Sequence, residues 1–168
     1  MHVRDATLDD AGAIAAMHAA SWRAFYRGSL SDSYLDGDIH SERQHVWRSR
    51  LSAPHEKQKV LIALIDNEPC GFICAFGSHD LTWGTLVDNL HVAASRHGSG
   101  LGTRLLLGVR KWAEHQGTLA GMYLWVIQSN QRALSFYKAR GGRVVGEDLW
   151  IPPGEGSLVP RYRIAWTF

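Results

Sequence analysis

The sequence predicts a mixed α/β fold, in which a central and mostly antiparallel sheet of about six to seven strands carries helices on both faces. Two observations predict it. Short apolar runs bounded by polar, Gly or Pro residues mark strands, and other runs repeat their apolar residues at helical spacing. The order of the predicted elements along the chain is one strand, two helices, three strands, one helix, one strand, one helix and two strands. This order describes a mixed sheet covered on both sides.

The N-terminal part predicts one strand and two helices. Thr7, with Asp10 three residues later, is a helix-start signal ahead of the apolar positions Ile14 and Met17. The segment 31–38 contains Asp, Ser and Gly, which favours a loop with a short helix. The expected elements are a strand over about 2–6, a first helix over about 8–26 and a second helix over about 41–51.

The central part predicts a three-stranded meander followed by an amphipathic helix. Apolar runs at 60–65 and 70–76 flank the polar turn 66–69, which predicts a β-hairpin, and 86–92 is the third strand. Apolar residues then recur at helical spacing over 101–113. They are Leu101, Leu105, Val109 and Trp112.

The C-terminal part predicts a strand, a helix and two further strands. A helical repeat ends at Gly141 and Gly142, residues of the type that commonly terminates helices. The repeat consists of Ala133, Phe136, Tyr137 and Arg140. The strands are expected over 122–126, 144–150 and 162–166, and a loop rich in Pro and Gly joins the last two over 152–160.

The composition fits one soluble domain over residues 1–168, because 168 residues with 45% hydrophobic side chains can bury one sizeable core. The net charge is only +2 and the charges are interspersed, so we expect no nucleic-acid-binding face. No apolar stretch resembles a signal peptide or a membrane span, so we expect a cytoplasmic protein without membrane contact. Cys70 and Cys74 lie four apart and match neither a redox nor a zinc motif, which favours small core residues in a reducing compartment.

A glycine-punctuated turn joins the third strand of the meander to the amphipathic helix. Gly98, Gly100 and Gly102 alternate, so backbone amides can approach a ligand without interference from a Cβ. A helix start also carries unpaired N–H groups and a partial positive charge, and this combination binds phosphate. A dinucleotide fingerprint is excluded because Thr103 stands where its third glycine would be, and no Lys-Ser/Thr pair follows to make a P-loop.

The turn resembles the x-x-G-x-G pyrophosphate loop of the GNAT N-acetyltransferase superfamily. Three further segments share the resemblance: the strand 88–92, the strand 124–126, and the run Asn-x-x-Ala-x-x-Phe-Tyr that begins at Asn130. The resemblance is specific over roughly 60–147. The chain departs from the family at His97, where the loop usually opens with Arg or Gln.

The run 22–28 looks like the substrate-side helix of a bacterial branch of the superfamily whose members mostly lack assigned substrates. The resemblance implies an acetyl-CoA-dependent N-acetyltransferase that moves the acetyl group directly to a primary amine of a small molecule or peptide. No Cys in the motif can act as a nucleophile. The residues it implies for cofactor binding are Leu90, His91, Val92, His97, Gly98, Ser99, Gly100, Leu101, Gly102, Thr103, Asn130, Ala133 and Tyr137.

Tyr137 occupies the position from which this superfamily often supplies a general acid to the coenzyme A sulfur. A phenol with a pKa near 10 is protonated at neutral pH and can donate to a thiolate. Packing of an aromatic ring beside Phe136 is the alternative. Asn130, at the start of the same helix, can cap that helix or contact the cofactor.

Asp88 and His91 are the titratable groups on the strand that enters the loop, and they are the candidate catalytic bases beside solvent. Because side chains alternate along a strand, residues three apart face opposite sides unless a bulge intervenes. Asp88 is therefore expected to share a face with Leu90 and Val92, which favours it over His91. Many relatives have Glu at the start of this strand, where this chain has Leu86.

Trp22 and Tyr26 lie one helical turn apart, so they are either core residues or a wall of the acceptor pocket, with the loop 152–160 opposite. No metal is expected, because His40 and His45 lie five apart and lack a ligand spacing. Three alternative functions stay open: an acyl-CoA sensor without turnover, a transferase of a larger acyl group such as succinyl, and a phosphate-binding domain of another fold. The identity of the amine and the oligomeric state, a homodimer included, stay open as well.

Overall fold

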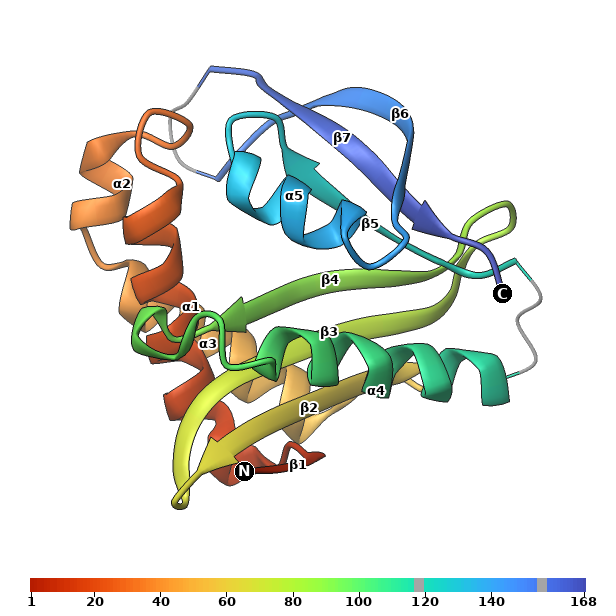
Figure 1. Cartoon of the computed structure of the whole chain (residues 1–168). Helices are drawn as coiled ribbons and strands as arrows, with labels where there is room; N and C mark the ends of the chain where they lie inside the picture. The colour runs from red at the N-terminus through yellow and green to blue at the C-terminus, as the bar shows by residue number, and fades with distance from the viewer. Residues whose placement is uncertain (117–119, 154–156) are drawn as a thin grey trace.

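The computed structural model describes residues 1–116, 120–153 and 157–168, and its sheet has seven strands in the order β1-β2-β3-β4-β5-β7-β6 (Figure 1). Neighbouring strands are antiparallel except β4 and β5, which are parallel. The strands are β1 (His2–Asp5), β2 (Gln58–Ile65), β3 (Glu68–Asp80), β4 (Gly84–Val92), β5 (Met122–Ile127), β6 (Arg143–Trp150) and β7 (Val159–Trp166). The predicted mixed and mostly antiparallel sheet is confirmed.

Helices cover both faces of the sheet. The helices α1 and α3 pack together on one face, and α4 and α5 lie on the other (Figure 1). The helices are α1 (Ala11–Phe25), α2 (Asp32–Asp36), α3 (Ile39–Ser52), α4 (Leu101–His115) and α5 (Gln131–Lys138). In the described part of the chain, no helix is long and apolar enough to cross a membrane.

The apolar runs of β2 and β3 are continuous because both faces of these strands are buried. Ile73 packs with Leu105 in the core on the α4 face, whereas Phe72 and Cys74 pack with Trp47 in the core under α1 and α3. Side chains that alternate along one strand therefore enter two different cores. This arrangement makes the sheet the rigid centre of the molecule.

The hairpin turn between β2 and β3 is shorter than the sequence predicts. Asp66 and Asn67 make the turn alone, with φ of 51° and 65°, and the next strand already starts at Glu68. Two residues with positive φ are typical of the tight hairpin turn whose twist matches that of the flanking strands.

Other boundaries differ from the expected ones as well, among them those of the first helix and the last strand. The first helix begins as a separate 3-10 turn at Leu8–Asp10. The last strand, β7, begins at Val159, inside the expected loop 152–160. Of that loop, the segment 154–156 lies outside the described residues.

The strands β4 and β5 touch backbone to backbone where they begin. A Cβ on Gly84 would lie 2.3 Å from the carbonyl oxygen of Gly121, and a Cβ on Gly121 would lie 2.0 Å from that of Trp166. Both glycines have positive φ, 77° and 110°. Only glycine allows this close approach. The contact marks the point from which the two strands diverge (Figure 1).

Candidate active site

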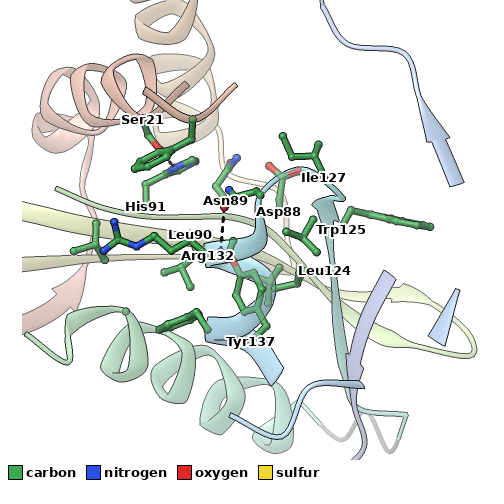
Figure 2. A pocket seen from close by; sticks show the side chains of 18 of the residues that line it. Ser21, Asp88, Asn89, Leu90, His91, Leu124, Trp125, Ile127, Arg132 and Tyr137 are labelled. Carbon is green, nitrogen blue, oxygen red and sulfur yellow. Dashed lines mark hydrogen bonds between the residues drawn. The ribbon is translucent and has the colours of Figure 1, made fainter. Parts of the chain in front are cut away.

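The two parallel strands pair over only two residues each and then separate. Thr85 pairs with Met122 and Leu86 pairs with Tyr123, and the described residues show no further pairing between them. A pocket of about 710 Å³ opens along the divergence, lined by both strands, α1, α3, α5 and the glycine turn (Figure 2). This volume is in the range of small-molecule and cofactor sites.

Every residue that the sequence analysis assigned to the site lines this pocket except Ser99. The pocket thus brings together Asp88, His91 and Tyr137 with the glycine turn. Ser99 belongs to the turn, but its hydroxyl donates to the carbonyl oxygen of Arg96 at 2.6 Å and so stiffens the turn from outside.

The glycine turn has the geometry of an anion site. Gly98 and Gly100 have φ of 81° and 82°, and a Cβ on either would have open space around it, so their backbone amides are unobstructed. The N-cap residue of α4 is Gly100, and among the described residues no side chain caps the start of this helix. The first intrahelical bond runs from Arg104 N to Gly100 O at 3.0 Å, which leaves the amides of the first turn available to an anion.

His97 supports the turn rather than reaching into it. Its Nε2 lies 2.9 Å from the carbonyl oxygen of Val92, so the imidazole ties the turn to the end of β4. The position that usually carries Arg or Gln in the superfamily therefore has a structural contact here.

Tyr137 lies on α5 between two aromatic neighbours. Its ring makes edge contacts with Phe136 and Trp166, at centroid distances of 5.2 and 6.0 Å. Within the described residues its hydroxyl has no hydrogen-bond partner, and burial raises the pKa of Tyr137 above its ordinary value. The phenol therefore stays protonated at neutral pH and is free to donate. The structure shows packing and exposure to the pocket together.

Asn130 caps α5. Its side-chain oxygen accepts from the backbone N–H of Ala133 at 3.0 Å. Of the two roles left open for Asn130, the structure shows capping, and the residue also lines the pocket.

A β-bulge overturns the expected orientation of Asp88. Cys74 pairs with Asn89 whereas the next residue of β3, Ala75, pairs with Val87, so Asp88 has no partner on β3. The extra residue reverses the alternation, and Asp88 points toward α3. The expectation that it shares a face with Leu90 and Val92 is wrong, because alternation was counted without this bulge.

The Asp88 carboxylate is held by α3. Its Oδ2 accepts from Arg50 Nη1 at 2.7 Å, and the same nitrogen donates to Asn89 Oδ1 at 3.1 Å. The guanidinium is itself fixed over the ring of Trp47, 5.2 Å from its centroid. The carboxylate therefore has a fixed orientation and a permanent counter-ion.

His91 lies on the same side of β4 as Asp88, against α1. Its Nδ1 lies 2.7 Å from Ser21 Oγ, and its ring packs 4.8 Å from that of His18 and 5.2 Å from that of Phe72 (Figure 2). Burial lowers the pKa of His91 to about 4. The imidazole is therefore neutral at physiological pH.

His18, beneath His91, is buried and neutral. Its Nδ1 accepts from Trp47 Nε1–H at 3.0 Å, so the proton of the neutral ring is on Nε2. Burial lowers the pKa of His18 far below its ordinary value, and the nearby Arg43 and Arg50, together with His91 when it is protonated, lower this pKa further. The neutral His18 ring is thus held in one orientation against His91.

Trp22 and Tyr26 pack in a core and also line the pocket, and their role toward an acceptor stays a prediction. Their rings stack at a centroid distance of 5.5 Å, and Tyr26 meets the edge of Trp150 at 6.4 Å. Trp22 is buried in a core with Leu30 and Leu35. Both aromatic residues also line the pocket.

Sequence reasoning missed Ser21, Arg43 and Arg50, which line the pocket next to the predicted residues. The two arginines lie seven residues apart, a spacing of about two helical turns that places them on one face of α3. That spacing is a usable signal, but it is common on solvated helices, and only the fold shows which face covers the sheet.

The comparisons with known proteins agree with this geometry. The chain matches the Acetyltransferase (GNAT) family over residues 14–141. It is 30% identical over 168 residues to "Probable N-acetyltransferase Rv2775" of Mycobacterium tuberculosis, a match that covers 98% of this chain and 93% of the relative. It is 27% identical over 149 residues to "Uncharacterized N-acetyltransferase YuaI" of Bacillus subtilis, covering 87% of this chain and 82% of the relative.

The fold is also found in solved structures. The PaiA N-acetyltransferase of Thermoplasma acidophilum, in complex with coenzyme A, aligns with a TM-score of 0.76 at 20% identity and covers 98% of both chains. Such identity concerns the fold, and the family match and the curated relatives carry the assignment. The chain belongs to the GNAT acetyltransferase family and is an N-acetyltransferase.

Proposed function

We propose that the enzyme transfers the acetyl group of acetyl-CoA directly to a primary amine of a small molecule or peptide, without a covalent enzyme intermediate. One observation carries the proposal: a single pocket collects the glycine turn, Tyr137 and the two titratable groups Asp88 and His91. Phosphate binding, proton donation and proton acceptance are thereby available in one cavity.

The phosphate end of the donor fits the glycine turn. The unobstructed amides at Gly98 and Gly100 and the N-terminus of α4 offer hydrogen-bond donors and a positive potential to a pyrophosphate. Arg96, Arg132 and Arg140 line the same pocket and add positive charge there.

The separated stretches of β4 and β5 fit the extended arm of the donor. Their facing backbone groups pair with no strand beyond Leu86 and Tyr123 in the described residues, so they can pair with an extended ligand as a strand would. A backbone N–H in this stretch of β4 can polarise the thioester carbonyl. The side chains of Leu90 and Val92 pack toward the α4 core, and their contribution is positional.

Acetyl-CoA supplies the activated thioester, and the residues of the chain move the protons. Tyr137, protonated and without a partner in the described residues, donates to the sulfur as the carbon–sulfur bond breaks. Asp88 and His91 are the candidates to take the amine proton, directly or through water. The bulge places both on one side of β4, so a single amine can meet either group.

Two measurements test the proposal. Calorimetric titration with coenzyme A should show binding to the purified protein, and a thiol-release assay with acetyl-CoA should show turnover that depends on an added primary amine. Binding without turnover on any amine of a broad panel would favour the sensor function. Faster turnover with succinyl-CoA than with acetyl-CoA would favour the larger acyl group. Absence of coenzyme A binding would refute the proposal.

A further inference from the structure

The charged side chains that line the pocket are strongly unequal in sign. Among the described residues they are six arginines and one aspartate. The positive residues are Arg43, Arg50, Arg96, Arg132, Arg140 and Arg161, and the negative one is Asp88.

Three of these arginines belong to the phosphate end. Arg96 is in the glycine turn region, and Arg132 and Arg140 are on or next to α5. Arg140 Nε donates to Thr103 Oγ1 at 2.7 Å, in the first turn of α4. These three face the phosphates of the donor under the proposed function.

The other three line the pocket from other elements. Arg43 and Arg50 come from α3, on the far face of the sheet, and Arg161 comes from β7. Arg50 is neutralised inside the pocket by Asp88. The acidic partners of Arg43 and Arg161 are Glu42 and Asp148, and neither of them lines the pocket. The pocket lining therefore includes two guanidinium groups whose counter-ions do not line it.

Arg43 and Arg161 are held in place by aromatic rings. The Arg43 guanidinium lies 4.8 Å from the centroid of Trp22, and that of Arg161 lies 4.2 Å from the centroid of Trp125. Their side chains are only 12% and 23% exposed. The Nε of each is buried and out of reach of a ligand. Each carboxylate partner engages only Nη2, so Nη1 of each guanidinium has no partner among the described residues and keeps its donor capacity.

We propose that the amine acceptor carries a carboxylate, which Arg43 and Arg161 hold while the amine lies at Asp88 and His91; this rests on the proposed function. A guanidinium fixed on an aromatic ring is well suited to a carboxylate, since its fork geometry matches two oxygens. The same positive surroundings disfavour a polycationic amine. They also favour the neutral form of the amine, which is the nucleophile.

The experiment compares amines that differ only in charge. Glycine, β-alanine and 6-aminohexanoate are each paired with the corresponding carboxamide, and aminomethylphosphonate and spermidine are added as a second anion and a polycation. We expect kcat/KM for at least one carboxylate to exceed that for its carboxamide by tenfold or more. The length of the amino acid with the highest kcat/KM shows how far the bound carboxylate lies from the reacting amine.

Two variants separate recognition from folding and from donor binding. Arg43→Met keeps the apolar stem over Trp22 and should lower kcat/KM for the carboxylate tenfold or more, while the carboxamide changes less than threefold. Arg110→Met removes an equal charge from the exposed side of α4 and should change neither. Should Arg43→Met not fold, Arg161→Met and Arg43→Lys give the same comparison. Coenzyme A affinity, measured in parallel, should be unchanged in all variants.

The outcomes distinguish this inference from the proposed function. Equal or higher kcat/KM for carboxamides or spermidine, with coenzyme A bound and acetyl transferred, would overturn the carboxylate inference alone. A preference for aminomethylphosphonate over every carboxylate would also overturn it. Loss of coenzyme A binding in the unmodified enzyme would refute the proposed function instead.

Discussion

The Asp88 carboxylate lies 2.7 Å from the Arg50 guanidinium, a contact between the bulged residue of β4 and the last turn of α3. The pair joins α3 to β4 beside the pocket. It also keeps the carboxylate on the same side of β4 as the His91 imidazole, where an acceptor amine would lose its proton under the proposed function.

Asp88→Asn removes a proton acceptor while keeping the side-chain shape. We expect kcat/KM to fall tenfold or more. We also expect the rise of kcat/KM with pH to flatten or shift, because this rise reflects the ionisation of the base that deprotonates the amine. Initial rates from pH 4 to 9, a range that includes the pKa of about 4 of His91, check this. His91→Gln is the companion variant, and a profile moved only by His91→Gln would assign the base to His91. A profile moved by neither variant would leave the proton to solvent.

Tyr137→Phe removes only a hydroxyl. We expect kcat to fall about a hundredfold, at the low end for a general acid, because the departing thiolate loses its proton donor. Coenzyme A affinity should stay within a few-fold, and calorimetry measures it. A variant with unchanged kcat would assign Tyr137 to packing against Phe136 and Trp166.

Gly100→Glu places bulk and a negative charge at the N-cap of α4. Open space surrounds its Cβ position, but φ is 82° there and the pyrophosphate would meet a carboxylate, so coenzyme A affinity should fall tenfold or more, about 1.4 kcal/mol. The control is Gly146→Glu in β6, where a Cβ also has open space but no phosphate is expected. Calorimetry that shows equal affinity for both variants would remove the turn from the cofactor site.

Gly121→Ala tests the close backbone approach between the start of β5 and the end of β7. Its Cβ would lie 2.0 Å from the Trp166 oxygen at a φ of 110°, so backbone must move, and we expect a loss of at least about 2 kcal/mol of unfolding free energy. Gly12→Ala in α1 meets nothing within 4 Å and should be neutral or stabilising by up to about 1 kcal/mol. Urea denaturation of both variants gives the comparison, and similar midpoints would contradict the predicted close approach.

The buried imidazoles predict acid sensitivity. The pKa of His91 is lowered to about 4 in the folded chain, against an ordinary value near 6.5 in the unfolded chain. Between these values the unfolded chain binds more protons, so stability is present above about pH 6.5 and is lost as the pH falls toward 4. His91 alone accounts for about 2 kcal/mol between pH 7 and 5, and His18 adds in the same direction. Urea titrations at both pH values should show a smaller difference for His91→Gln than for the parent.

Local sequence patterns predicted most of the helices and strands. The features that they did not predict depend on strand register and on contacts between distant parts of the chain. The runs of β2 and β3, the α4 repeat and the glycine turn are each contained within a few residues, so their signals are complete in the sequence. The bulge at Asp88 depends on which residue of β3 pairs with Val87, and no glycine marks it. The contact of Ser21 with His91 joins residues seventy positions apart, and only tertiary packing creates it.

The Gly84 and Gly121 contact places backbone against backbone at the point where β4 and β5 diverge. No side chain fits between the strands there, so substitutions at this point disturb the sheet before they reshape the pocket. Under the proposed function, altered preferences for donor or acceptor would then arise farther along the pocket: from Leu124 and Val126 for the donor, and from α1 and α3 for the acceptor. The same backbone contact can therefore be kept while the substrates change.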